Sequence, residues 1–226
     1  MPPPSTDLQA LKKRVLIVDD HPVFRAGLTG LVNLEKDLVV CGEAHDATQA
    51  MRALESLSPD LVLLDMSLPG KGGLELLKDI RAGHPQTPVL IISMHDEALY
   101  AERVIRAGGR GYIMKQEGPE KVIKAVRRVL GGGICVSENI SALILDTLAK
   151  PAGQQKKASS VSTLTDREFE IYRHIGQGRE PQGIAEVLHL SIKTVDTHRN
   201  HIKRKLGIKN NTELVHHATR WAADQG

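Results

Sequence analysis

Val15-Leu-Ile-Val-Asp-Asp20 decides the fold, because it joins a continuous apolar tetrad to two carboxylates. Continuous apolar runs of this length are typical of strands that are buried on both faces, as in a parallel sheet. Two further runs also end at a charged side chain: Leu61-Val-Leu-Leu64 precedes Asp65, and Gly111-Tyr-Ile-Met114 precedes Lys115. In parallel sheets the ligand-binding and catalytic residues lie beyond the carboxyl ends of the strands. We therefore predict that these charged ends meet in one crevice.

The charges in that crevice indicate its ligands. Asp19, Asp20 and Asp65 are like charges, and three carboxylates packed together are unstable unless a cation lies among them. Carboxylate oxygens are the ligands that Mg²⁺ prefers, and Lys115 adds a positive charge suited to a phosphate oxygen. The pattern predicts a site for Mg²⁺ and a phosphoryl group.

The pattern around these runs predicts an α/β domain. Residues 14–130 alternate strand-like and helix-like segments five times, which is the signature of a doubly wound α/β fold. We predict strands near 14–18, 38–43, 60–64, 88–93 and 110–114 and helices near 22–34, 46–57, 74–82, 97–107 and 119–130. The predicted organisation is a flexible arm at 1–12, the α/β domain at 13–131, a linker at 132–162 that includes a short helix at 137–150, and a second domain at 163–226.

The second domain shows no strand pattern. Thr165 followed by Glu168 is a capping box that opens a helix. We predict four helices, near 166–176, 181–188, 192–206 and 211–223. Two short helices joined by a three-residue turn, of which the second is basic, are typical of a helix-turn-helix. The segment Ser191–Lys209 carries six basic residues against Asp196 alone, although the net charge of the chain is only +3. This local positive charge suits a groove of DNA.

Composition bounds the remaining possibilities. The 226 residues suffice for two modest domains. Cys41 and Cys135 form no metal-binding spacing, which favours a reducing compartment. The first residues lack the apolar segment of a signal peptide, and no apolar run approaches membrane-spanning length. We expect a soluble, cytoplasmic protein that does not act at a membrane.

The α/β domain resembles the receiver domain of bacterial two-component response regulators, which has a (βα)5 flavodoxin-like fold. The resemblance rests on Asp19-Asp20 after the first strand, Asp65 after the third, Ser93 after the fourth and Lys115 after the fifth. It implies that Asp65 is the phospho-acceptor, attacking the phosphohistidine of a sensor histidine kinase. It also implies that Asp65 is a Mg²⁺ ligand and that Lys115 pairs with a phosphoryl oxygen.

The same resemblance assigns roles to the neighbouring residues. Asp20 would bind Mg²⁺ directly, Asp19 largely through water, and the backbone carbonyl of Ser67 would complete the protein ligands. Ser93 and Tyr112 would respond to phosphorylation. The Ser93 hydroxyl would hydrogen-bond the phosphoryl group, and the Tyr112 ring would rotate inward. Such a domain transfers a phosphoryl group to itself and loses it slowly, so we do not expect a turnover enzyme.

Two histidines flank this site, and we expect both at the surface. His21 follows the acidic pair. His95 lies two positions after Ser93, where receivers vary in ways thought to tune the lifetime of the phosphoryl group.

The second domain resembles the LuxR-type helix-turn-helix, the output domain of the NarL/FixJ subfamily, through Leu164–Ile171 and Ile184–Gly207. We expect its small core to contain Ile184, Leu188, Leu190, Val195, Ile202 and Leu206. Residues expected to face the major groove are Lys193, Thr194, Asp196, Thr197 and Asn200. The expected phosphate contacts are Arg199, Lys203 and Lys205. His198 belongs to the same DNA-facing set.

Two features of this domain admit more than one interpretation. His198 and His201, three positions apart, suggest a metal, but no third ligand is near in sequence, so surface or DNA-backbone roles are favoured. In LuxR-type domains the last helix pairs two copies on DNA. Leu214, Ala218 and Trp221 would supply its apolar stripe, although the same residues could instead cover the core of the monomer.

We thus predict a regulator that a sensor histidine kinase phosphorylates and that binds double-stranded DNA as a homodimer. An alternative is a DNA-binding regulator that works without phosphorylation. A less favoured one is a Mg²⁺-dependent phosphohydrolase, which would need an acidic residue two positions after Asp65, where Ser67 stands. A nucleotide or flavin binder would need a phosphate-binding loop after the first strand, where the acidic pair has the wrong charge.

Overall fold

The computed structural model describes residues 12–138, 140–142, 160–188 and 190–223. The chain divides into two compact units, Met1–Asp146 and Thr147–Gly226, which are described separately. The predicted N-terminal arm and most of the predicted linker lie outside the described residues. Of the helix predicted at 137–150, residues 140–142 are helical and the residues after them lie outside the described part.

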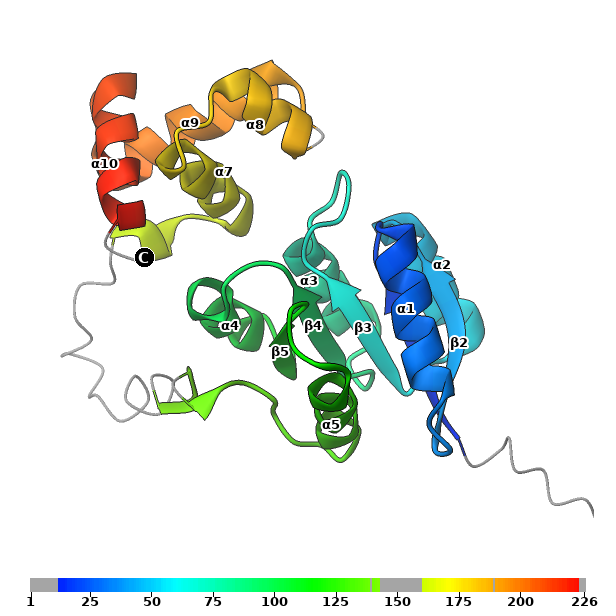
Figure 1. The fold of residues 1–226 in the computed structure, drawn as a ribbon. Helices are drawn as coiled ribbons and strands as arrows, with labels where there is room; N and C mark the ends of the chain where they lie inside the picture. Colours follow the sequence, from blue (N-terminus) through cyan, green and yellow to red (C-terminus); the bar gives the residue numbers. More distant parts are fainter. Residues whose placement is uncertain (1–11, 139, 143–159, 189, 224–226) are drawn as a thin grey trace, which may run out of the picture. The chain divides into compact units, whose positions relative to one another are not determined.

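The first unit is built on a parallel five-stranded sheet (Figure 1). Its strands are β1 (Lys13–Val18), β2 (Leu38–Ala44), β3 (Leu61–Asp65), β4 (Val89–Ser93) and β5 (Gly111–Met114). Their spatial order is β2-β1-β3-β4-β5, and every neighbouring pair is parallel. The strand order reverses between β1 and β3, and a crevice opens at such a switch point beyond the carboxyl ends of the strands. The predicted doubly wound α/β fold is confirmed.

Five helices connect and cover the strands. They are α1 (Pro22–Asn33), α2 (Ala47–Leu57), α3 (Gly73–Gly83), α4 (Glu97–Arg106) and α5 (Pro119–Leu130). Pro22 and Pro119 stand at the first helical position, where a missing N–H costs nothing. Helix α2 ends at Ser58, which adopts a left-handed conformation with φ of 44°.

The core has two layers because successive side chains of a strand point to opposite faces. On one face, alternate strand residues such as Val15, Ile17 and Leu63 pack with buried residues of α1 and α5. Helices α2, α3 and α4 contribute buried residues such as Leu54, Leu77 and Tyr100 to the remaining core. Because β1, β3 and β4 are buried over their apolar runs, the strand ends that carry the polar residues are held rigidly.

Two close backbone approaches support the strand ends. A Cβ on Gly73 would lie 2.2 Å from the carbonyl oxygen of Asp65, so only glycine lets α3 start directly beneath that residue. A Cβ on Gly111 would lie 2.6 Å from the carbonyl oxygen of Cys135. Cys135 forms an isolated parallel bridge with Gly111, so the start of the segment expected to be a linker lies against the edge of β5.

The second unit is helical. It contains the short 3-10 helix η2 (Ser160–Thr163) and the helices α7 (Asp166–Gly176), α8 (Pro181–Val187), α9 (Ile192–Leu206) and α10 (Asn211–Ala223). The predicted capping box is present at α7, where Thr165 and Glu168 satisfy each other's backbone N–H groups. Helix α9 starts at the N-cap Ser191 and ends at Gly207, which has φ of 69°. None of the described helices combines the length and apolarity needed to cross a membrane.

The core of the helical unit follows the prediction in part. Ile184, Val195 and Ile202 are fully buried, while Leu188, Leu190 and Leu206 are half-buried. Residues that the sequence pattern did not assign to this core are also buried, namely Phe169, Ile171, Tyr172 and Ile175. Leu214 and Ala218, for which a core position was one of two interpretations, are buried as well. Helices α7 and α10 therefore contribute as much to the core as the helix-turn-helix itself.

Candidate functional site

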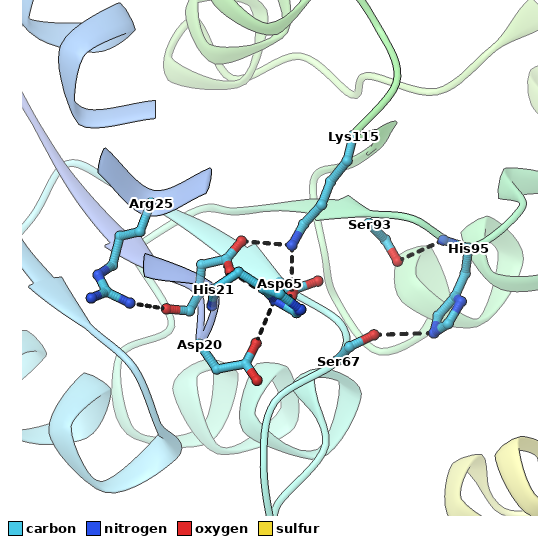
Figure 2. A network of polar contacts seen from close by, with 9 residues as sticks. Asp20, His21, Arg25, Asp65, Ser67, Ser93, His95 and Lys115 are labelled. Atoms are coloured by element: carbon cyan, nitrogen blue, oxygen red, sulfur yellow. Dashed lines mark hydrogen bonds and ion pairs between the residues drawn. The ribbon is translucent and has the colours of Figure 1, made fainter. Parts of the chain in front are cut away.

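Three of the predicted site residues meet at the carboxyl ends of β1, β3 and β5 (Figure 2). The ammonium group of Lys115 lies 2.8 Å from Asp65 Oδ2 and 2.7 Å from Asp19 Oδ2. All three side chains are nearly inaccessible: Asp19 is 0% exposed, Asp65 1% and Lys115 4%. One buried cation thus bridges two buried carboxylates, which leaves the pocket with excess negative charge.

The pocket does not satisfy Asp65 fully. Burial raises the pKa of the Asp65 carboxyl above its ordinary value, and the ion pair and hydrogen bond with Lys115 oppose that rise only partly. Its Oδ2 accepts the hydrogen bond of Lys115, whereas its Oδ1 is buried and accepts none. A buried carboxylate oxygen without a donor is unusual and indicates a missing cationic or hydrogen-bonding partner.

The neighbours of the pocket hold these groups in place. The ammonium of Lys115 lies 4.4 Å from the centroid of the Phe24 ring, a cation–π contact from α1. Arg25, also from α1, donates to the backbone carbonyl of Asp19 at 2.6 Å and to Glu43 of β2 at 3.0 Å. Neither Phe24 nor Arg25 was predicted from the sequence, because helix α1 shows only an ordinary amphipathic pattern there.

His21, expected at the surface, is exposed and also lies beside the carboxylates. Its side chain is 62% exposed, but its Nδ1 lies 2.8 Å from Asp20 Oδ1, 3.3 Å from Asp19 Oδ1 and 3.8 Å from Asp65 Oδ2. One ligand atom from each of these four residues lies within 4.8 Å of the others. The convergence of three carboxylates, together with the unsatisfied Asp65 Oδ1, fits a divalent cation with oxygen ligands.

A chain of polar contacts joins this pocket to the end of β4 (Figure 2). His95 Nε2 lies 3.2 Å from Ser67 Oγ, and the backbone N–H of His95 donates to Ser93 Oγ at 3.1 Å. The hydroxyl of Tyr112 donates to the backbone carbonyl of His95 at 2.8 Å. The His95 ring also stacks on Tyr100 of α4, with centroids 5.2 Å apart. His95, expected at the surface, is partly exposed and contacts four residues around the site.

The two expected readout residues are both buried. Ser93 is 0% exposed and Tyr112 is 2% exposed. The backbone of His95 connects the Tyr112 hydroxyl to Ser93 Oγ.

In the helical unit, most of the expected base-reading residues lie on the outer face of α9. Lys193, Asp196, Thr197 and Asn200 are exposed, whereas Thr194 is half-buried. The Thr194 hydroxyl lies 2.7 Å from Ser191 Oγ, so it belongs to the N-terminal cap of the helix. Lys193, Thr197 and Asn200 are exposed and carry donors suited to phosphates and base edges, although the Thr197 hydroxyl donates to the Lys193 carbonyl at 2.9 Å.

The expected phosphate contacts of α9 are engaged within the domain. Arg199 pairs with Asp196 at 3.0 Å, and Lys203 donates to Asn211 at 2.9 Å. The Arg199 side chain is only 13% exposed, whereas that of Asp196 is 53% exposed. Lys205 differs, because it lies 2.6 Å from Oε2 of Glu168, whose side chain is only 4% exposed. Lys205 thus holds α9 against α7.

The apolar stripe expected on the last helix is taken up by the monomer itself. Leu214 and Ala218 are both 0% exposed. Trp221 packs against Phe169 and Tyr172, with centroids 5.5 and 5.4 Å away. The alternative that these residues cover the core of the monomer therefore fits Leu214 and Ala218, and a dimer contact through α10 stays a prediction. Outward-facing residues of α10 include Val215, which is 42% exposed.

Both units match known protein families. The family described as "Response regulator receiver domain" matches residues 15–127, and the family described as "Bacterial regulatory proteins, luxR family" matches residues 162–218. The chain is 33% identical to the oxygen regulatory protein NreC of Staphylococcus carnosus over 92% of this chain and 97% of that protein.

Two solved structures are also similar. A LuxR-family response regulator from Aurantimonas sp. SI85-9A1 is 32% identical, with a TM-score of 0.56 over 62% of this chain and 99% of that one. A structure of two RcsB dimers bound to two parallel DNAs is 26% identical, with a TM-score of 0.56 over 92% of this chain and 98% of that one.

Fold, site and relatives together define a two-component response regulator: a receiver domain followed by a LuxR-type DNA-binding domain. The chain belongs to the LuxR-type response regulators, the NarL/FixJ subfamily, and it controls transcription as a member of a two-component system.

Proposed function

We propose that Asp65 is the residue of this receiver that accepts a phosphoryl group from the phosphohistidine of a sensor histidine kinase. The observation that carries the proposal is the buried Asp65–Lys115–Asp19 arrangement, with Asp65 Oδ1 lacking a hydrogen bond. That oxygen attacks phosphorus, the P–N bond to the imidazole breaks, and the electron pair returns to the imidazole nitrogen. Lys115 pairs with a phosphoryl oxygen as the charge on the group is redistributed.

The carboxylates around Asp65 suit Mg²⁺ as the resident cation. Asp20 and Asp65 would hold it directly, Asp19 largely through water, and Ser67 through its backbone carbonyl. A bound Mg²⁺ neutralises charge on the transferring phosphoryl oxygens. His21, whose Nδ1 lies 2.8 Å from Asp20 Oδ1, has to turn away when a cation takes its place among the carboxylates.

Magnesium dependence provides the first test. With Mg²⁺ and a small-molecule phosphodonor such as acetyl phosphate, we expect the purified chain to gain an acid-stable, base-labile phosphoryl group. Chelation of Mg²⁺ before the donor is added should remove at least roughly nine-tenths of the labelling, because the uncompensated carboxylates then repel the incoming phosphate. Phosphate-affinity electrophoresis of the intact chain measures the labelling with Mg²⁺ and after chelation. Equal labelling with and without chelator would contradict the assignment.

Ser93, His95 and Tyr112 would convert phosphorylation into a change of surface. The proposal is supported by the contacts that run from Ser93 Oγ through the His95 backbone to the Tyr112 hydroxyl. The Ser93 hydroxyl oxygen accepts from the His95 backbone N–H, and a phosphoryl group on Asp65 would offer an acceptor for the Ser93 O–H. The loop between β4 and α4 then shifts, which biases a two-state surface formed by α4, β5 and α5.

The His95 side chain should also set how long the phosphoryl group persists. Its ring lies 3.2 Å from Ser67 Oγ and stacks on Tyr100, at the rim of the pocket. Because a side chain there limits the access of water to phosphorus, we expect His95→Ala to lose the phosphoryl group severalfold faster than the wild type. Decay of the purified phosphoprotein measures the rate. His45→Ala, which removes an exposed histidine elsewhere on the receiver, should decay at the wild-type rate.

The helical domain would bind double-stranded DNA through α9. Lys193, Asp196, Thr197 and Asn200 would face the major groove, with Thr194 at the cap of the helix. Arg199 and Lys203 would exchange their internal partners for phosphates. His198, expected in the same set, is half-buried and lies on the side of α9 that faces Glu168 of α7. Lys205 would contribute mainly by holding α9 in place, in view of its contact with Glu168. The DNA-bound dimers of the related RcsB support binding as a homodimer, to half-sites about one helical turn apart.

We further propose that the chain is not a turnover enzyme and works in the cytoplasm, where DNA and a phosphorylated kinase domain are both accessible. The proposed division of the chain is an arm at 1–12, the receiver at 13–131, a linker at 132–162 and the DNA-binding domain at 163–226. The two family matches, at 15–127 and 162–218, support this division.

A further inference from the structure

The DNA-binding domain contains a second cluster of metal-binding side chains, which its sequence spacing hides. It consists of Glu168 on α7 and of His198 and His201, one turn apart on α9. One ligand atom from each residue lies within 4.8 Å of the other two. The rings of His198 and His201 meet edge to face with centroids 6.3 Å apart, and His201 Nδ1 lies 3.8 Å from Glu168 Oε1. The fold thus brings Glu168, which is distant in sequence, to the two histidines as a third ligand.

The two carboxylate oxygens of Glu168 contact different groups. Oε2 accepts the backbone N–H of Thr165 at 2.7 Å, which closes the capping box, and it lies 2.6 Å from Lys205 Nζ. Oε1 is the oxygen that faces His201. A cation held by Oε1 therefore leaves the cap of α7 intact. The side chain of Glu168 is 4% exposed, so its orientation is fixed before any cation arrives.

We propose that Glu168, His198 and His201 bind Zn²⁺. Two imidazole nitrogens and one carboxylate oxygen form a donor set that Zn²⁺ prefers and Mg²⁺ does not, and water would complete the tetrahedron. Zn–ligand bonds of about 2.0–2.1 Å need ligand atoms roughly 3.4 Å apart, so the site closes by small rotations of the histidines. His201 is 44% exposed and free to rotate in this way.

Lys205 contacts the other oxygen of Glu168, close enough for a cation on Oε1 to repel its ammonium group. Its ammonium now neutralises Glu168, and its side chain is 29% exposed. The long stem lets the ammonium withdraw into solvent when Zn²⁺ takes over the charge of the carboxylate. The metal then replaces a single flexible ion pair between α7 and α9 with a three-ligand crosslink, which stabilises the folded domain.

A comparison of three full-length proteins tests the proposal. Chelator-treated wild type, His201→Gln and His216→Ala are titrated with Zn²⁺ against a chromophoric chelator. His216 is an exposed histidine of α10 and serves as the matched control. Any Zn²⁺ that binds at the receiver pocket does so in all three proteins and does not affect the differences between them. We expect His201→Gln to lose one Zn²⁺ ion per chain, or to bind it at least roughly tenfold more weakly, since even outer-shell changes cost that much. His216→Ala should match the wild type.

Two further measurements guard against a folding defect. Circular dichroism checks that His201→Gln is folded, and His198→Gln provides a second variant with the same expected loss. In the wild type, Zn²⁺ should move the imidazole resonances of His198 and His201 and leave that of His216 in place. Wild-type stoichiometry and affinity in folded His201→Gln, or unmoved His198 and His201 resonances, would overturn the proposal.

Discussion

Asp65→Asn is expected to abolish phosphorylation of this chain and, with it, the increase of DNA affinity that phosphorylation produces. The amide has nearly the shape of the carboxylate but lacks the nucleophilic anion that must attack phosphorus. Lys115 keeps its 2.7 Å contact with Asp19 in the variant, so the pocket retains a paired cation and the fold should persist. The loss is therefore expected in chemistry and not in stability.

The matched control is Asp79→Asn. Asp79 is an exposed carboxylate of α3 that pairs with Lys71 at the surface. The Asp79→Asn protein should become phosphorylated at the wild-type rate and to the wild-type level. Phosphate-affinity electrophoresis and a DNA-binding titration, each with and without phosphodonor, measure the two effects. Phosphorylation of Asp65→Asn to the wild-type level would show that another residue is the acceptor.

Asn200→Ala and Lys193→Ala are expected to weaken specific DNA binding strongly while leaving phosphorylation unchanged. Both side chains project from the exposed face of α9, so their removal should not unfold the domain. A bidentate contact between an asparagine and an adenine is worth about 1–3 kcal/mol against the wrong base. We therefore expect Asn200→Ala to lose affinity and to relax the sequence preference at one position of the half-site.

The measurement uses a duplex selected from a random pool by the phosphorylated wild-type protein, with affinities determined at several salt concentrations. Arg220→Ala is the matched control, because Arg220 is an exposed basic residue of α10. It should bind nearly as the wild type does. If Arg220→Ala lost as much affinity as Asn200→Ala, or if Asn200→Ala lost none, α9 would not be the recognition helix.

The fold was predictable because the strand pattern and the helix boundaries agree along the chain. Each predicted strand, and each predicted helix of the two domains, has its ends within one residue of the observed ends. Apolar tetrads such as Leu61–Leu64 admit only a buried strand once proline and glycine mark the neighbouring turns. The bridge between Gly111 and Cys135 was not predictable, because a single pair after a helix leaves no periodic signal.

The receiver pocket was predictable for the same reason, since its charged residues stand directly after buried strands. The positions of His21 and His95 were not. Whether a loop side chain turns into a pocket or into solvent depends on the path of the loop, which residue type and spacing do not specify. The structure puts His21 among carboxylates and His95 beside Ser67.

The helical domain was less predictable than the receiver. Leu214 and Ala218 have a spacing that serves a dimer contact or a monomer core equally well, and the packing of α7 against α10 selects the core. Glu168 was recognisable as a capping residue only. Its contacts with Lys205 and His201 join positions more than thirty residues apart and depend on how α7 crosses α9.

The central claim is that Asp65, in a pocket that holds a divalent cation, is where the phosphoryl group attaches. Reduction of the phosphorylated wild-type chain with borohydride converts an aspartyl phosphate to homoserine, and peptide mass spectrometry then locates the homoserine. We predict homoserine at position 65 alone, in a sample treated with Mg²⁺ and phosphodonor, and at no position when Mg²⁺ is chelated beforehand. Homoserine at another aspartate, with Asp65 unmodified, would contradict the account.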